Sequence, residues 1–186
     1  MLKGLRAAVL KVIAKDSIQM HDGVAVIARG DTLSIVYALP ARLHRTRWLF
    51  DRAERLALAN ANGILCMMLV LPTAEMPDAA TRAENVLRLK KLGPALRKLV
   101  TVPVGDMLRI SLVRTVMRGL SILHGTARSH AIATTVDDGL RKLLEAAGPN
   151  TPTLSELQAD LRAMCRELGV PAPPIGSTGK ELRIPR

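Results

Sequence analysis

The spacing of hydrophobic positions changes from one segment of the chain to the next, and this change predicts a succession of strands and helices. Between residues 18 and 39, β-branched and small apolar residues form short runs, which the sequences HDG and RGD separate. Such runs predict two or three strands joined by tight turns. Residues 41–60 then carry apolar side chains at helical spacing, Leu56 and Leu58 among them, and Gly63 suits the end of that helix.

Two apolar runs in the middle of the chain lack the alternation of a half-exposed strand. The run ILCMMLVL at 64–71 is typical of a strand buried on both faces of a parallel sheet. A second run at 99–104 predicts another strand, and Pro103 should fall at its end or on an edge because proline cannot donate inside a sheet. The remaining predicted elements are helices over 78–92, 107–123 and 136–147, a short strand over 130–135, and a last helix over 153–168.

This order of elements predicts an α/β fold. We expect a mixed sheet of four to five strands with crossover helices, and one extra helix at each end of the chain. Thr153 and Glu156 have the spacing of a capping box and mark the start of the C-terminal helix. The expected parts are a basic amphipathic helix over 1–16, the α/β domain over 17–149, the C-terminal helix over 150–169 and a flexible Pro-rich tail over 170–186.

Composition adds that the core is aliphatic and the surface basic. Hydrophobic residues make up 48% of the 186 residues but aromatic residues only 2%, so aliphatic side chains and methionine must fill the core. The net charge of +11 suggests either an anionic partner or a solvated Arg-rich surface. The candidates for a basic surface fall in the segments 41–60 and 78–98. They are Arg42, Arg45, Arg52, Arg55, Arg88, Lys91, Arg97 and Lys98.

The sequence offers no motif for catalysis or metal binding. It contains no Gly-rich phosphate loop, no G-x-S-x-G elbow and no paired histidines or cysteines at metal-ligand spacing. The carboxylates lie mostly at predicted turns and helix starts, where turn formation and capping account for them. We therefore expect a protein that is not an enzyme and that uses no cofactor and no metal.

The cysteines and the apolar runs bear on localisation. Cys66 and Cys165 are isolated, which matches a reducing, cytoplasmic compartment better than a disulfide framework. The longest apolar run, 63–72, is about half a membrane span. We expect a cytoplasmic protein, with peripheral association at a membrane as the alternative.

Four stretches together resemble a known family. They are GVAVIARGDTLSIVYALP, GILCMMLVLPTAEMPDAATRAENVL, LRKLVTVPVGDMLRISLVRTVMRGLSIL and SHAIATTVDDGLRKLLE. In order and local texture they resemble the strands and helices of the STAS superfamily, the fold of anti-sigma-factor antagonists, and within it the STAS-like (SpoIIAA-like) group that includes lipid-carrier-like proteins. The resemblance covers roughly two-thirds of the chain and implies a regulatory module that works through protein contacts.

The resemblance also implies a place for a regulatory switch. In that family a serine or threonine begins the helix after the central strand, usually directly after an aspartate, and its phosphorylation alters partner binding. Here Asp78 is present, alanine follows it, and Thr81 is the nearest hydroxyl. Asp78 can instead act as a helix cap. We expect the loop to serve as a contact surface through Thr73, Glu75, Asp78, Thr81 and Arg82.

These observations lead to three hypotheses about function. The first is a non-enzymatic STAS-like regulatory or scaffold module that binds proteins and associates with itself as a homo-oligomer, because two apolar-faced terminal helices must bury their stripes. The second is binding of a lipid or small apolar ligand at an acidic membrane surface, which the basic N-terminal helix favours. The third, non-specific nucleic-acid association, follows from charge alone and is disfavoured because aromatic stacking platforms are scarce.

Overall fold

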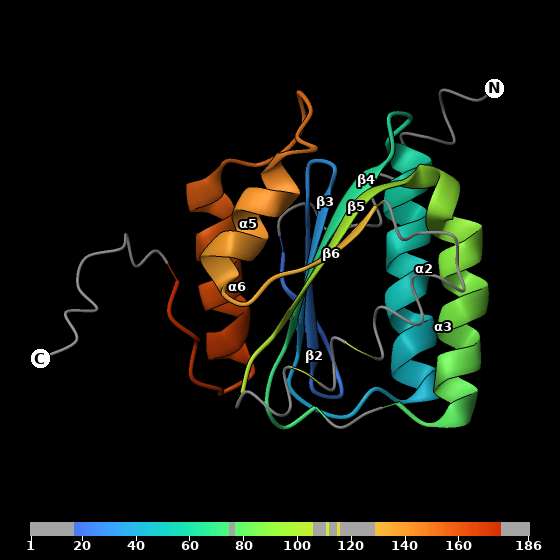
Figure 1. Ribbon diagram of the computed structural model, residues 1–186, viewed down its shortest axis with the longest axis vertical. Coiled ribbons are helices and arrows are strands. Elements are labelled where there is room, and N and C mark those ends of the chain that lie inside the picture. Colours follow the sequence, from blue (N-terminus) through green and yellow to red (C-terminus); the bar gives the residue numbers. More distant parts are fainter. Residues whose placement is uncertain (1–16, 75–76, 106–110, 112–114, 116–128, 176–186) are drawn as a thin grey trace, which may run out of the picture.

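A single mixed sheet stands between two layers of helices (Figure 1). The computed structural model describes residues 17–74, 77–105, 111, 115 and 129–175. The strands follow one another across the sheet in chain order, antiparallel from β1 to β3 and parallel from β3 to β6. They are β1 (Gln19–His21), β2 (Val24–Arg29), β3 (Thr32–Tyr37), β4 (Ile64–Val70), β5 (Leu96–Pro103) and β6 (His130–Ile132).

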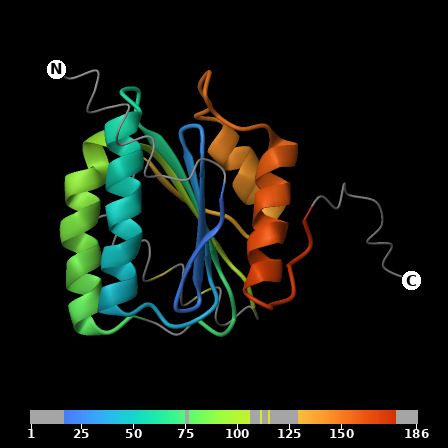
Figure 2. The ribbon, with the colours of Figure 1, turned by 180° about the vertical axis from the view of Figure 1, so that it is seen from behind.

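The helices divide into two pairs, one on each face of the sheet, as the views from front and back show (Figures 1 and 2). The helices α2 and α3 cover one face, and the helices α5 and α6 cover the other. This arrangement confirms the α/β class and the mixed sheet that the sequence predicts. The described helices are α2 (Leu43–Ala59), α3 (Ala79–Leu92), the 3-10 turn η1 (Gly93–Ala95), α5 (Val136–Leu144) and α6 (Leu154–Glu167).

The sheet contains six strands, so the expectation of four to five was wrong. The strand β1, left open as the third of two or three strands over residues 18–39, is present and pairs with β2 from Gln19 opposite Val26 to His21 opposite Val24. It has only three residues, and its sequence QMH is polar at both ends. A strand this short cannot show the period of two by which strands are recognised in a sequence.

The strand β4 is buried on both faces, as its uninterrupted apolar sequence predicts. Leu65, Met67 and Leu69 join the core beneath α5 and α6, whereas Ile64 and Cys66 join the core beneath α2 and α3. All five side chains are at most 4% exposed. Both helical layers are therefore needed to keep this strand out of water.

Several local signals in the sequence are confirmed. The Asp78 side chain caps α3, Thr153 and Glu156 form the expected capping box of α6, and Pro103 ends β5. The strand β5 begins at Leu96, three residues earlier than expected. The helix expected over 1–16 lies outside the described residues, as does the tail from residue 176. The helix expected over 107–123 lies almost entirely outside them.

The helix α6 packs against β2 and β3 of its own chain. A buried ion pair fixes this contact, because the Arg29 guanidinium donates two hydrogen bonds to the Asp160 carboxylate, each 2.9 Å long. Asp160 is only 4% exposed. The apolar side chains that α6 contributes to the core are Leu157, Leu161, Met164 and Cys165.

The RGD sequence forms the tight turn between β2 and β3. Gly30 has a φ of +57°, and a side chain there would collide with the Asn150 carbonyl. The Asp31 carboxylate accepts a hydrogen bond from the Thr151 hydroxyl at 3.0 Å and pairs with the Arg97 guanidinium. The charged groups of this tripeptide are thus engaged inside the chain, in accord with its interpretation as a turn.

Replacing Asp160 tests whether the pair with Arg29 holds α6 in place. We expect Asp160→Ala to lower the free energy of unfolding by roughly 2–4 kcal/mol, because the partly buried guanidinium would lose a bidentate carboxylate partner. Glu167→Ala, at an exposed position of the same helix, is the matched control and should change stability by less than about 0.5 kcal/mol. Denaturant unfolding of both variants is the measurement, and equal stabilities would contradict the role given to this pair.

Candidate functional site

The helices α2 and α3 begin at the same edge of the sheet, where the parallel strands β3 and β4 end (Figure 1). The Leu71 N–H donates to the Tyr37 carbonyl across these strand ends, and the loop after β4 leads into α3. Loops at the carboxyl ends of parallel strands commonly carry the functional residues of α/β proteins. The loop from Pro72 to Asp78 lies at this edge and contains much of the predicted contact loop.

The predicted loop residues hold the loop and the start of α3 in place. The Thr73 hydroxyl donates to the Ala38 carbonyl and so ties the loop to the end of β3. The Arg82 guanidinium donates to the Pro77 carbonyl at 2.7 Å and remains exposed. Glu75 lies outside the described residues. The loop therefore has a defined shape at both of its described ends.

The capping contact of α3 sets the positions of Asp78 and Thr81. The Thr81 N–H donates to the Asp78 carboxylate at 2.7 Å, and this hydrogen bond holds the pKa of Asp78 below its usual value. Thr81 is fully buried. A kinase or a partner reaches the Thr81 side chain only if the first turn of α3 opens, so Thr81 does not contribute to the exposed surface of the loop.

Arg45 does not belong to a basic surface, and its assignment there was wrong. It is 8% exposed, and its guanidinium donates to the Asp22 carboxylate and to the Pro40 carbonyl. Its position in α2 places it against the turn between β1 and β2, which the helical pattern of the sequence cannot reveal. Arg42, at the N-cap of α2, and Arg55, on the helix, are by contrast exposed as expected.

Arg97 and Lys98 were grouped with the basic residues of the segment 78–98, and this was also wrong. Both belong to the strand β5, because α3 ends at Leu92. The Arg97 side chain pairs with Asp31, and the Lys98 ammonium lies 3.3 Å from the Glu145 carboxylate at the end of α5. Neither cation therefore lies in line with the basic side chains of α3.

Arg52 is half-buried against an aromatic side chain. Its guanidinium carbon lies 3.7 Å from the centre of the Trp48 ring, which stacks on the His21 ring at 5.1 Å. The Arg52 Nε also donates to the Gln19 side chain at 2.8 Å. These contacts attach β1 to α2, and they occupy the Trp48 ring, which a stacking nucleic-acid base would otherwise need.

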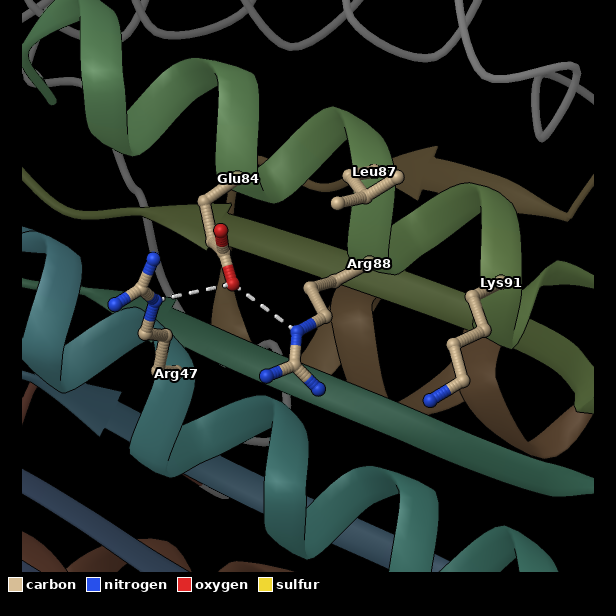
Figure 3. A pocket seen from close by; sticks show the side chains of 5 residues that line it. All are labelled: Arg47, Glu84, Leu87, Arg88 and Lys91. Carbon is tan, nitrogen blue, oxygen red and sulfur yellow. Dashed lines mark hydrogen bonds and ion pairs between the residues drawn. The ribbon is translucent and has the colours of Figure 1, made fainter.

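A ladder of ion pairs joins the outer sides of α2 and α3 (Figure 3). The Glu84 carboxylate accepts from Arg47 of α2 at 3.3 Å and from Arg88 of α3 at 3.1 Å. The Glu54 carboxylate accepts from Arg88 at 2.8 Å and from Lys91 at 2.7 Å. We call these five residues, together with Asp51 at 3.4 Å from Arg88, the charge ladder.

Contacts within the ladder shift the pKa values of three of its members. The hydrogen bond from Arg88 lowers the pKa of Glu84. Burial alone would raise the pKa of Glu54, but hydrogen bonds from Lys91 and Arg88 bring it below its ordinary value. The same contacts, led by the one from Glu54, raise the pKa of Arg88. These shifts all favour the charged forms of Glu54, Glu84 and Arg88.

An open groove of about 650 Å³ runs along the ladder, lined by Arg47, Glu84, Leu87, Arg88 and Lys91 (Figure 3). Leu87 is 65% exposed there, although four charged side chains surround it. A second leucine of the same layer, Leu58, is 71% exposed near the end of α2, where the helical pattern assigned it to the apolar side. The α2–α3 face thus combines fixed charges with two exposed apolar side chains.

The two helical layers differ in charge. The helices α2 and α3 together carry eight basic and three acidic side chains, whereas α5 and α6 carry four basic and five acidic ones. The excess of positive charge expected from the composition is therefore concentrated on one layer of the described structure. A partner that approaches the α2–α3 face meets a positive surface.

Sequence reasoning identified only part of this surface. Arg88 and Lys91 were expected to be basic surface residues, but Arg47, Glu84 and Leu87 were not singled out. The spacing of Glu84 and Arg88, four residues apart on a helix, is the signal that could have suggested their pairing. The pairing of Arg47 with Glu84 depends on the alignment of α2 against α3, which local patterns do not contain.

Searches for other kinds of site and for relatives gave negative results. Within the described ranges, no group of three or more histidine, cysteine or acidic side chains could hold a metal ion. None of the helices in the described part combines the length and apolar character of a membrane span. Comparison with models of known protein families, with curated proteins and with solved structures finds no match in any of the three sets.

Both cysteines are shielded, which gives a direct test of the core. Burial raises the pKa of the Cys66 thiol to about 12 and also raises that of Cys165. We expect neither thiol to react with a thiol-specific reagent in the folded protein at pH 8, and both to react once the chain is unfolded, because only the thiolate is nucleophilic. A colorimetric thiol count with and without denaturant makes this comparison. A thiol that reacts as fast in the folded as in the unfolded chain would contradict the packing of that cysteine.

Proposed function

We propose that this chain is a non-enzymatic regulatory or scaffold module of STAS-like fold that binds another protein through its α2–α3 face. The charge ladder beside the exposed Leu87 is the observation that carries this proposal. Residues 77–78 lead into α3, and Arg82 in the first turns of that helix donates to the Pro77 carbonyl. The surface then extends from the edge of the sheet along both helices.

The state of the ladder side chains supports binding to a protein. Arginine is enriched at protein interfaces, and covering the exposed Leu87 would remove apolar surface from water. Arg47 and Arg88 are held by carboxylates before any partner arrives, which reduces the conformational entropy lost on binding. The groove is too open to enclose a small molecule, whereas an extended partner can cover it.

The burial of α6 within its own chain removes one reason to expect a second copy as the partner. Self-association was expected partly because this helix has an apolar stripe to bury, but Leu157, Leu161 and Met164 are fully buried within the same chain. Two copies that met through their α2–α3 faces would also bring two positive surfaces together. These points support a different protein as the partner, with a second copy as the alternative.

Changing Leu87 alone should separate binding from folding. We expect tagged full-length chain carrying Leu87→Glu to lose, by about tenfold or more, a protein that co-purifies with the unchanged chain from cells that make it. Its melting temperature should shift by no more than about 2 °C, because the side chain is largely exposed and glutamate favours a helix.

The matched control is Leu154→Glu, which changes an exposed leucine at the start of α6 in the other layer. It should retain the co-purifying protein at the level of the unchanged chain. Light scattering of the purified chain at high concentration tests for a second copy. Equal recovery of every co-purifying protein by the two variants, together with a monomeric mass, would contradict the proposed function.

A further inference from the structure

We propose that the groove between α2 and α3 is a docking site for an acidic amphipathic helix of the partner protein, with an apolar side chain of that helix seated on Leu87. This inference rests on the proposed function and adds the chemistry of the partner. The occupant is named from three properties of the face: its charge balance, the alternation of charges along the ladder, and the position of the exposed leucine.

The excess of positive charge on the α2–α3 face favours an acidic partner helix. Without the buried Arg45, its helices hold seven basic side chains against three acidic ones. The carboxylates of Asp51, Glu54 and Glu84 are already engaged by ladder cations. Arg55 and Lys90, both exposed, form no ion pair with another described residue. They lie on α2 and α3 but not among the residues that line the groove, so carboxylates at the margins of a bound helix would complement them.

The alternation of charges favours a helix over a phosphate backbone or an anionic membrane. Glu54 and Glu84 stand among the cations of the groove, so a dense row of phosphates would face carboxylates as well as cations. A helix can place an acidic side chain against each free cation and a neutral or basic one against each carboxylate, because it repeats every three to four residues. The groove between two neighbouring helices also suits the ridge of a third helix.

The exposed leucine supplies the apolar part of the contact. Leu87 lines the groove between the ion pairs of Arg47 and Lys91 and has 65% of its surface in water. Burial of such a side chain stabilises a complex, whereas the surrounding ion pairs mainly set which partner fits. The ladder spans about two helical turns, from Glu84 to Lys91, so a partner helix of roughly three to five turns covers it.

A synthetic helix tests this proposal on the full-length chain. The probe is a fluorescent peptide of about 18 residues with a leucine stripe flanked by glutamates, and the comparison peptide has the same composition in scrambled order. We expect the ordered peptide to bind with a dissociation constant on the order of 10–100 µM and the scrambled peptide at least about tenfold more weakly, because only the ordered one presents leucines on one face. Fluorescence anisotropy at two salt concentrations measures both.

Substitutions in the protein test whether the peptide binds in the groove. Leu87→Glu should weaken binding of the ordered peptide about tenfold or more. The double change Arg55→Glu with Lys90→Glu should also weaken binding of this peptide and should reduce the dependence of the affinity on salt. The matched controls are Leu154→Glu, and Arg141→Glu with Arg166→Glu on the other layer, which should bind as the unchanged chain does. Circular dichroism and melting curves verify that each variant is folded.

Three results would overturn the inference. The first is equal binding of the ordered and scrambled peptides, or binding of neither. The second is loss of binding in the control variants but not in Leu87→Glu. The third is tighter, Leu87-dependent binding of a DNA duplex or of vesicles of phosphatidylserine and phosphatidylcholine. If the peptide fails while Leu87→Glu still loses the co-purifying protein, the proposed function stands and only the helical, acidic nature of the partner is wrong.

Discussion

The strand β4 has no face that can be left in water, and the rest of the structure follows from this constraint. Each side of the strand needs its own layer of apolar side chains, so α2 and α3 cover one face and α5 and α6 the other. The scarcity of aromatic residues makes this core aliphatic, as in Leu65, Leu69 and Leu140, all fully buried. With both faces of the sheet covered, the outer sides of the helices and the loops are the surfaces left for a partner.

Charged side chains divide into those that hold the fold and those that face outward. Arg29 with Asp160, and Asp31 with Arg97, join segments far apart in the sequence and are largely buried. Pairs of this kind set which segments meet, because a lone charge at the same place would be costly. The charge ladder joins α2 and α3 in a similar way, but its outer side remains open to solvent. It therefore combines a structural role with the exposure that recognition requires.

Local features of the sequence sufficed for most of the secondary structure. The position of Asp78 at the start of α3, the capping box of α6 and the turn at RGD are determined by neighbours in the chain, and all three were predicted. The strand β1 was only the third of two or three possible strands, because its pairing with β2, and not its own pattern, makes it a strand.

The surface was harder to predict because its contacts are non-local. Arg45 and Arg97 looked like surface cations, but each is bound to a carboxylate from a distant segment. The ladder depends on how α2 lies against α3, so the pairing of Arg47 with Glu84 could not be read from either helix alone. Leu58 was assigned to an apolar side that the structure turns to solvent. Candidate residues on a helix can thus be proposed from sequence, whereas their partners and exposure require the packed structure.

Docking of an acidic amphipathic helix on the α2–α3 face can be tested most directly by locating the leucines whose environment changes when such a helix binds. Methyl spectra of full-length chain with isotope-labelled leucines, recorded during titration with the acidic amphipathic peptide, report each leucine separately. We expect the largest shift at Leu87, a smaller one at Leu58, and none at Leu154 on the opposite layer. Shifts concentrated on α5 and α6, with Leu87 unchanged, would contradict this docking.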